Sequence, residues 1–349
     1  MSEALLAQLV ANPGDLEARR VYGDALSERG DPRGELIAIA CTPAERRTPE
    51  VVAREAALSG QLRDELVARA AWQRTTWLDW QHGFVDELAF GIESGDPVDG
   101  LARLAVEPAL RLVRRVAVSA CEMDHRGDLH ALVAEFARLA PAFPRLVDFE
   151  IYTSADLGSP WYSGPSDLGD VAPLIRAYPR LTRLGLGGDP VAYGDGSATL
   201  ELPVLRELVA TNVTADSARS LVELRTPPLD ELELSFAQGA GIREVAIPLL
   251  AASAFAPRRL AVRRGGFLLD LLRRLTGAPL ASRLDVLAIE GVVTADDLDA
   301  IGAWASTTPA VARVEIDVAR LHRSTEQRAR RALGTRLAQL PPRRGHPRL

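Results

Sequence analysis

The sequence of 349 residues predicts an α/β protein, a repeat solenoid with a parallel β-sheet on its concave face and helices or turns on its convex face. An all-helical N-terminal domain and a cap are expected to precede the repeats. Three observations support this prediction. One apolar pattern recurs nine times, amphipathic stretches with helical spacing separate its copies, and strong helix breakers divide the first 42 residues.

The N-terminal domain, residues 1–42, is predicted to contain three short helices. Asn12-Pro13-Gly14 is a strong breaker and ends the first helix. We expect Gly30, which can adopt a positive φ, to follow the second helix, and Asp31 and Pro32 to supply the N-cap and first position of the third. The buried positions expected on the second and third helices are Leu16, Val21, Ala25, Leu26, Leu36, Ile37 and Ile39.

Charged side chains crowd the junction between the second and third helices: Asp24, Glu28, Arg29, Asp31, Arg33 and Glu35. A catalytic pair of carboxylates would need a dry pocket that raises the pKa of one member. A turn exposed to water offers no such pocket. We therefore interpret these residues as a helix cap and as solvent-facing or locally paired side chains.

This junction also resembles a known family. The stretch Val21-Tyr22-Gly23-Asp24-Ala25-Leu26-Ser27-Glu28-Arg29-Gly30-Asp31-Pro32-Arg33-Gly34-Glu35-Leu36-Ile37 is similar to the bacterial repeat-companion domain. The usual core of that family reads Tyr-Ala-Asp-Trp-Leu-Glu-Glu-Arg-Gly-Asp-Pro-Arg-Ala-Glu-Phe-Ile, so Ala25 stands where the family has tryptophan. The resemblance implies that repeats follow, often leucine-rich ones, and it implies no activity.

Residues 43–82 are predicted to form a helical linker and an N-terminal cap. The apolar residues from Val51 to Val67 recur at helical spacing. Trp72, Trp77 and Trp80 follow, three of the five tryptophans of the chain. We interpret the tryptophans as a cover for the end of the repeat stack, which must be shielded from water; the alternative is a platform for a ligand.

The repeats are predicted to occupy residues 83–320. Each copy reads apolar, two variable, apolar, one variable, apolar. The middle apolar residues are Leu88, Val116, Phe149, Leu184, Leu208, Leu232, Leu260, Leu287 and Val314. This pattern and its period resemble leucine-rich repeats, which implies one parallel strand in each repeat. The Asn or Cys of regular repeats appears only as Cys121, so we expect about nine irregular leucine-rich repeats.

Helices are expected between the strands. The stretch from Leu129 to Phe136 is amphipathic, and Thr294-Ala295-Asp296-Asp297 opens another helix with a signal like a capping box. The same four letters, Val-Thr-Ala-Asp, occur at 213–216 and 293–296 in nearly the same phase of the repeat. This recurrence supports the assignment of the repeats.

Strand alternation predicts the binding surface. The middle and third apolar residues should point inward, so their neighbours face the concave side, where small residues are expected to leave room for a partner. An insertion, residues 152–178, adds aromatic residues that could anchor an interface or fold back onto their own repeat. The predicted partner-binding residues are Asp148, Glu150, Tyr152, Trp161, Tyr162, Arg183, Glu207, Glu231, Glu233, Arg259 and Arg263.

The central strands of this surface carry mostly acidic residues, so the expected partner is another protein with a basic patch. A sheet face that only contacts water is the alternative. The chain as a whole has a formal net charge of −6, and an acidic body is unsuited to binding duplex nucleic acid. Arginines concentrate in residues 321–349, where we predict a closing helix from Thr325 to Leu340 and a basic disordered tail after it. Weak contact with nucleic acid through that tail is the remaining possibility.

No catalytic residue, cofactor or metal site is predicted. The chain has no lysine for a phosphate-binding loop, and none of its five histidines has the spacing of metal ligands. Cys121-Glu122-Met123-Asp124 loosely resembles the Cys-x-Asp of bacterial ligases attached to leucine-rich repeats, but a cysteine without a paired base is weak evidence for a nucleophile. We interpret Cys121 as structural.

The sequence therefore predicts a non-enzymatic scaffold or adaptor that binds its partner through the concave face. One form that such a protein could take is the recognition or immunity component of a bacterial multigene system. The alternative is an enzyme or enzyme regulator that uses Cys121 or Arg183. No apolar run is long enough to span a bilayer, and no secretory signal precedes the first helix. With only two cysteines, these features predict a cytoplasmic location.

Overall fold

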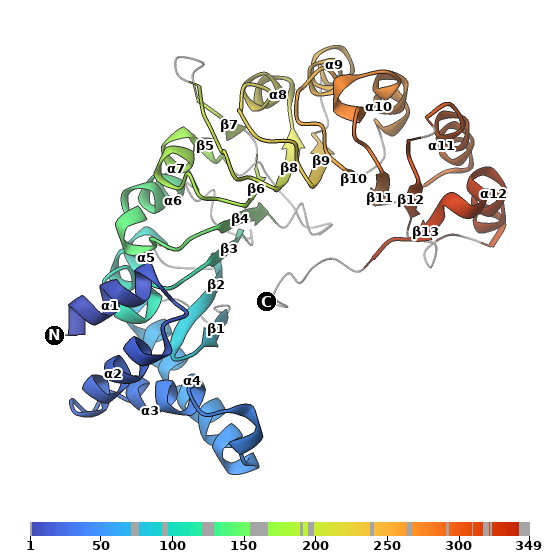
Figure 1. The fold of residues 1–349 in the computed structure, drawn as a ribbon. Helices are drawn as coiled ribbons and strands as arrows, with labels where there is room; N and C mark the ends of the chain where they lie inside the picture. The colour runs from blue at the N-terminus through green and yellow to red at the C-terminus, as the bar shows by residue number, and fades with distance from the viewer. Residues whose placement is uncertain are drawn as a thin grey trace. The chain divides into compact units, whose positions relative to one another are not determined.

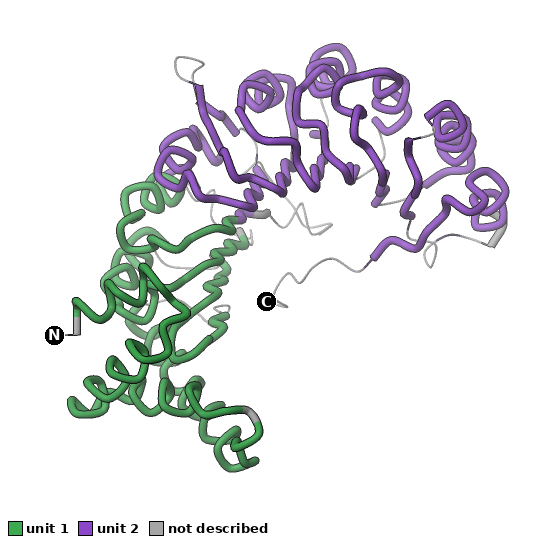
Figure 2. The backbone as a smooth tube through the Cα atoms, viewed as in Figure 1, with its two compact units in different colours: residues 1–125, 131–149, 347–349 green, residues 126–130, 150–346 purple. Residues whose placement is uncertain are grey.

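A computed structural model describes residues 2–70, 77–92, 97–120, 129–153, 167–188, 191–194, 199–237, 241–263, 267–290, 293–308, 310–316, 321 and 323–341. The chain divides into two compact units (Figure 2). Unit 1 consists of residues 1–125, 131–149 and 347–349, and unit 2 consists of residues 126–130 and 150–346.

An 11-stranded sheet contains most of the strands of the protein (Figure 1). In sheet order they are β1 (Trp77–Gln81), β2 (Phe84–Ile92), β3 (Arg115–Ala120), β4 (Asp148–Thr153), β6 (Arg183–Gly187), β8 (Glu207–Val213), β9 (Glu231–Phe236), β10 (Arg259–Arg263), β11 (Val286–Glu290), β12 (Arg313–Ile316) and β13 (Leu337–Gln339). β1 runs antiparallel to β2, whereas β2 is parallel to β3 and β8 is parallel to β9. The protein is thus an α/β protein with a large, mostly parallel sheet.

All nine strands predicted from the apolar pattern are present, at the predicted positions. Within unit 2 the middle residues of neighbouring copies stand opposite one another, so Leu184 pairs with Leu208, and Leu208 with Leu232. The same register continues through Leu260 and Leu287 to the last predicted copy. These leucines have no exposed surface, and their ladder forms the core of the unit.

Helices connect the strands. They are α1 (Ser2–Ala11), α2 (Leu16–Ser27), α3 (Arg33–Ala40), α4 (Pro49–Ala70), α5 (Pro97–Leu104), α6 (Leu129–Arg138), α7 (Ala172–Ala177), α8 (Ala215–Leu221), α9 (Ile247–Ala251), α10 (Leu268–Leu275), α11 (Ala295–Thr307) and α12 (Arg323–Leu333). In unit 2, α7 to α12 lie along one face of the sheet (Figure 1). A short second sheet pairs β5 (Gly169–Asp170) with β7 (Val191–Ala192) in parallel.

Two of these helices begin with capping boxes, one at Thr294, where the sequence predicts it, and one at Thr214 in the other copy of Val-Thr-Ala-Asp. At the start of α8 the hydroxyl of Thr214 accepts a hydrogen bond from the backbone amide of Ser217. At the start of α11 the hydroxyl of Thr294 accepts one from the backbone amide of Asp297. Each partner side chain accepts the amide of the threonine in return, so both helix ends satisfy backbone donors that would lack partners.

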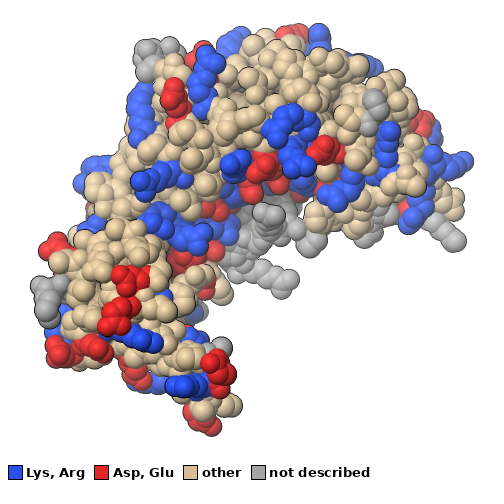
Figure 3. Space-filling view, in the orientation of Figure 1, with Lys and Arg blue, Asp and Glu red and all other residues tan. Residues whose placement is uncertain are grey.

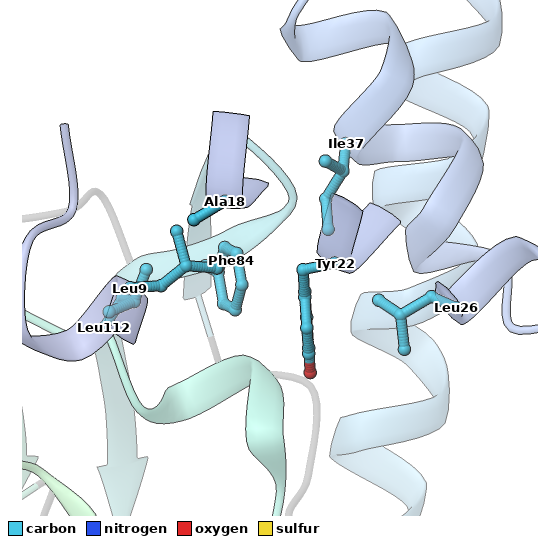
Figure 4. Close-up of a cluster of buried hydrophobic side chains, with 7 residues drawn as sticks. All are labelled: Leu9, Ala18, Tyr22, Leu26, Ile37, Phe84 and Leu112. Carbon is cyan, nitrogen blue, oxygen red and sulfur yellow. The ribbon is translucent and has the colours of Figure 1, made fainter. Parts of the chain in front are cut away.

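The three helices expected in residues 1–42 are present, but one of their buried faces differs from the prediction. Leu16 and Val21 are 53% and 41% exposed, which contradicts the prediction, whereas Leu26 is buried as expected. The apolar cluster includes Ala18 and Tyr22 of α2 in place of Leu16 and Val21, and it consists of Leu9, Ala18, Tyr22, Leu26, Ile37, Phe84 and Leu112 (Figure 4). Tyr22 stacks on Phe84 with 5.7 Å between the ring centroids. Tyr22 therefore takes the core position that we assigned to Val21.

The junction between α2 and α3 has the predicted turn, but α3 begins at Arg33, so Pro32 and not Asp31 occupies the N-cap position, one residue later than predicted. Gly30 adopts a φ of +72°, and the carboxylate of Asp31 accepts the backbone amide of Arg33 at 3.0 Å. The same carboxylate pairs with the guanidinium of Arg33. Both charged groups are thus held locally, as predicted for a helix junction.

The linker 43–82 is helical only in part. α4 confirms its first half, but residues 77–81 form the edge strand β1, which contradicts the helix that we expected there. The reason is a tight turn: His82 and Gly83 both have positive φ, at 54° and 79°, and two such residues favour a β-hairpin whose strands twist correctly. The strand covers the edge of β2, so the cap is a hairpin and not a helix.

A tenth parallel strand follows the predicted repeats. β13 pairs with β12 and places Leu337 opposite Val314. The single helix that we expected to continue as far as Leu340 ends at Leu333, so that prediction is wrong for the last residues. The basic tail expected after it lies mostly outside the described residues.

Candidate protein-interaction surface

The predicted binding surface lies on the face of the sheet opposite the helices of unit 2, which we call the open face. Leu184, Leu208 and Leu232 are fully buried on the helix side. Because side chains alternate along a strand, the residues next to these leucines point to the open face. The register then arranges the open-face residues in rows that cross the strands.

The first row is the most accessible. It runs across β6, β8, β9, β10, β11 and β12 through Arg183, Glu207, Glu231, Arg259, Val286 and Arg313. The side chains of Glu207 and Glu231 are 27% and 29% exposed, and that of Arg313 is 54% exposed. A partner that approaches the open face would meet these side chains.

The second row consists of Gly185, Val209, Glu233, Ala261, Ala288 and Glu315, and it is buried. In the third row Arg263 is buried, whereas the side chain of its neighbour Glu290 is 20% exposed. Glu150, Glu233 and Glu315 are 3%, 9% and 2% exposed, and Arg263 is 7% exposed. At Gly185 the room that we expected small residues to leave for a partner is already filled. A Cβ on Gly185 would lie 2.9 Å from the Cγ of Glu150, so the side chain of Glu150 already occupies that space.

Arginines hold the buried carboxylates. Arg183 contacts Glu150 through Nη1 and Oε2 at 2.7 Å and contacts Glu207 through Nε and Oε2 at 3.4 Å. Arg263 pairs in the same manner with Glu233 and, at 3.4 Å, with Glu290. Each of these guanidinium groups therefore joins carboxylates from two different strands, which lowers the cost of burying them.

Arg259 connects strands that are not adjacent. It pairs with Glu231 on β9 and, through Nη2 at 3.0 Å, with Oε2 of Glu315 on β12. Arg313 contacts the other oxygen of Glu315 at 2.8 Å. The acidic stripe expected from the sequence is thus interrupted by arginines from the same sheet. Acidic and basic side chains are likewise interspersed on the face of unit 2 that Figure 3 shows.

Two carboxylates of the first row are direct neighbours. Glu207 and Glu231 stand opposite each other in adjacent strands, and their arginine partners, Arg183 and Arg259, lie on the outer sides of the two strands. Like charges placed directly opposite each other repel. β8 and β9 therefore present two half-buried carboxylates side by side.

Unit 1 has an ion-pair cluster of the same kind on β2, β3 and β4. Arg115 lies 3.3 Å from Glu87 and 3.4 Å from Asp148. Burial raises the pKa of Glu87, and attraction to Arg115 opposes that effect. Of the predicted binding residues only Asp148 belongs to unit 1, where it is one partner of Arg115.

The structure thus divides the predicted binding residues. Arg183, Glu207, Glu231 and Arg259 are accessible in part, whereas Glu150, Glu233 and Arg263 are buried and paired. Tyr152 lies in β4, but its side chain is outside the described residues, as are Trp161 and Tyr162 entirely. Cys121, the residue of the alternative enzymatic hypothesis, also lies outside them.

Three residues of the ion-pair network were missing from the predicted binding set: Glu290, Arg313 and Glu315. All three follow the strand alternation that identified the others, so the signal was present in the sequence. What the alternation did not reveal is which acid each arginine would reach, because the pairs join residues in different repeats.

Within the described part of the chain, no group of three or more His, Cys, Asp or Glu side chains could hold a metal ion. None of the helices described there combines the length and the apolar character needed to cross a bilayer. No protein-family model matches the chain, and no curated protein matches it either.

Proposed function

We propose that the chain is an irregular leucine-rich-repeat protein with an N-terminal repeat-companion domain, and that it acts as a non-enzymatic protein-interaction scaffold. The recurring strand in a constant register and the capped helices between strands support the repeat assignment. The Gly-Asp-Pro-Arg turn at residues 30–33 supports the companion-domain assignment. Repeat arrays of this kind commonly expose one broad sheet face to a partner.

The partner in this proposal contacts the first row of the open face and places a basic side chain between Glu207 and Glu231. The observation that carries this proposal is the register of β8 and β9, which places Glu207 directly opposite Glu231. Arg183 engages Glu207 and Arg259 engages Glu231, and both carboxylate side chains remain more than a quarter exposed. An arginine or lysine from another protein would relieve their repulsion and would add a directional contact.

The buried pairs have a different role in this proposal. Glu150, Glu233 and Arg263 fix the backbone positions of the strands and do not touch the partner. Affinity would come in larger part from aromatic residues, for which the sequence offers Tyr152, Trp161 and Tyr162. Replacing Trp161 by alanine should then accelerate dissociation more than it slows association.

The experiment is affinity capture from the native host, followed by kinetics with the captured protein. The double substitution Glu207→Gln and Glu231→Gln should slow association by roughly tenfold and flatten its dependence on salt, because electrostatic attraction chiefly affects the association rate. Glu223→Gln, an exposed carboxylate near the end of α8, is the matched control and should leave both quantities unchanged. If the double variant associates like the wild type at every salt concentration, the first row is only a solvated surface.

A further inference from the structure

The charges on the open face of unit 2 are unevenly distributed across its strands. On this face β8 and β9 carry three carboxylates, those of Glu207, Glu231 and Glu233, and no basic residue. On the same face β10, β11 and β12 carry three arginines and two carboxylates: Arg259, Arg263, Arg313, Glu290 and Glu315. One half of the face is therefore acidic and the other is more basic, so a matching occupant needs charges in the opposite order.

The side chains that reach solvent keep this order. Glu207 and Glu231 are 27% and 29% exposed, Val286 on β11 is half-buried, and Arg313 is 54% exposed. Arg313 contacts a carboxylate of its own strand through Nη2, and a guanidinium has five N–H donors, so donors remain for an acceptor from outside. Arg259 is only 21% exposed and already pairs with two carboxylates. From β8 to β12 the accessible order is thus acidic, acidic, paired arginine, apolar and basic.

The spacing of the first row restricts the shape of the occupant. From β8 to β12 the first-row residues stand opposite one another in one register, and neighbouring strands lie about 4.8 Å apart. An α-helix that crosses the strands presents a side chain to them every three or four residues, about 5 Å along its axis. An extended chain presents one every ~6.6 Å and soon falls out of step with the strands. A helix therefore matches the row, with one side chain for each strand.

We propose that the occupant of the open face is an amphipathic helix of the partner, which lies across β8 to β12. This inference rests on the proposed scaffold function and adds the form of the partner to it. Two basic residues one turn apart face Glu207 and Glu231, an apolar residue faces Val286, and an acidic residue faces Arg313. The acidic residue lies toward the N-terminus of the helix and the basic ones toward its C-terminus, because this order also suits the helix dipole.

The probe is a synthetic alanine-based peptide of about 20 residues, because such peptides are partly helical in water. From its N-terminus Glu, Leu, Ala, Arg and Arg follow at intervals of three or four residues, so they share one helix face. Fluorescence anisotropy of the labelled peptide should show saturable binding to the full-length protein, and circular dichroism should show that its helicity rises on binding. A peptide of the same composition with these residues on different faces, and a copy with a central proline, should bind roughly tenfold more weakly.

Variants of the protein test the orientation of the helix. Glu231→Gln and Arg313→Gln should each weaken peptide binding by about tenfold, the size expected for a lost hydrogen bond between charged groups. Arg313→Glu should weaken it further, and exchange of the glutamate of the peptide for arginine should restore it, as expected for groups in contact. Arg273→Gln on α10, 75% exposed and outside the open face, is the matched control and should bind as the wild type does.

Saturable binding that depends on both helix formation and Arg313 supports the proposal. The proposal is overturned if the helical peptide does not bind, if the permuted peptide binds equally well, or if the charge exchange fails to restore binding. The scaffold function has a separate readout, the association of the captured partner with the Glu207→Gln and Glu231→Gln double variant. A captured partner that responds to this variant, beside a helical peptide that does not bind, overturns only the helical form of the occupant.

Discussion

Charged side chains on the open face of unit 2 and at the α2–α3 junction of unit 1 pair over very different distances along the chain. Arg33 at the junction pairs with Asp31, two residues away. Arg259 on the open face reaches Glu231 and Glu315, which are 28 and 56 residues away. Neighbouring strands of a sheet lie about 4.8 Å apart, so a long side chain on a strand can reach acidic residues of several repeats. At the helix junction the partner of Arg33 is a residue close to it in sequence.

Ion pairs of the two units also cover a wide range of accessibility. The side chains of Arg263 and Glu233 are 9% and 12% exposed, whereas those of Arg54 and Glu35, which join α4 to α3, are 54% and 46% exposed. Exposed pairs contribute little to stability, but breaking a buried pair leaves a charge without water or a partner. The energetic effect of an ion pair therefore depends on its burial, and the junction pair of Arg33 and Asp31, at 15% and 25% exposed, lies between these two cases.

The largest effect should come from Arg263→Met. This substitution leaves the buried Glu233 without its guanidinium, and we expect it to lower the free energy of unfolding by roughly 3–5 kcal/mol. Denaturant unfolding monitored by circular dichroism measures the loss. Arg273→Met is the control, because Arg273 is 75% exposed and its pair with Asp270 should contribute less than about 1 kcal/mol. Equal losses in the two variants would remove the distinction between buried and exposed pairs.

A somewhat smaller effect is expected from Gly83→Ala, at the hairpin that contacts the N-terminal helices. Gly83 has a φ of +79°, and a Cβ there would lie 2.2 Å from Cγ1 of Ile37. Strain and overpacking together should cost roughly 2–4 kcal/mol. Gly60→Ala on α4 meets nothing within 4 Å and should instead stabilise the protein by up to about 1 kcal/mol. A neutral Gly83→Ala would mean that the helices do not depend on this close approach.

The smallest of the three effects concerns the junction itself. Asp31→Ala should lower the free energy of unfolding by roughly 0.5–2 kcal/mol, the usual contribution of a side chain that accepts a backbone amide at the start of a helix, as Asp31 does from Arg33. Binding to a captured partner should not change, because Asp31 lies in unit 1 and outside the first row. A loss of partner binding at unchanged melting temperature would assign the junction a functional role.

The contribution of Asp31 should also depend on pH. Burial by itself would raise its pKa, but hydrogen bonds from Arg33 outweigh burial and lower the pKa below its ordinary 3.8. A carboxyl whose pKa is lower in the folded state stabilises the fold above the unfolded pKa and loses that contribution as the pH falls through the folded value. The stability difference between wild type and Asp31→Asn should therefore be constant near neutral pH and shrink below about pH 4.

The apolar pattern predicted nine strands because each copy must bury the same three positions against its neighbours, as Leu208 and Leu232 do. β13 escaped the prediction because Leu337-Ala338-Gln339 has only one large apolar residue. β1 escaped it because Trp77, Leu78 and Trp80 lack strict alternation. The His82-Gly83 turn was the available signal for β1.

For the candidate site, the alternation of side chains along each strand predicted the correct face of the sheet for Glu207 and Glu231. It did not predict the arginines that pair with them. Whether a carboxylate is free or paired depends on the residues of other repeats. Glu315, for instance, forms an ion pair with Arg259 because only β11 separates β10 from β12 in the folded sheet. No local window of sequence contains that information. The acidic stripe was therefore predicted, and its neutralisation by arginine was not.

The ion pair from Arg259 to Glu315 has a consequence for the evolution of the chain. Arrays of repeats gain and lose whole copies by recombination, and each copy usually depends only on its neighbours. Here the pair passes over β11, whose Ala288 is small and fully buried. Loss or duplication of the copy that contains β11 would change the span between the two charges, so the segment from β10 to β12 should be inherited as one block.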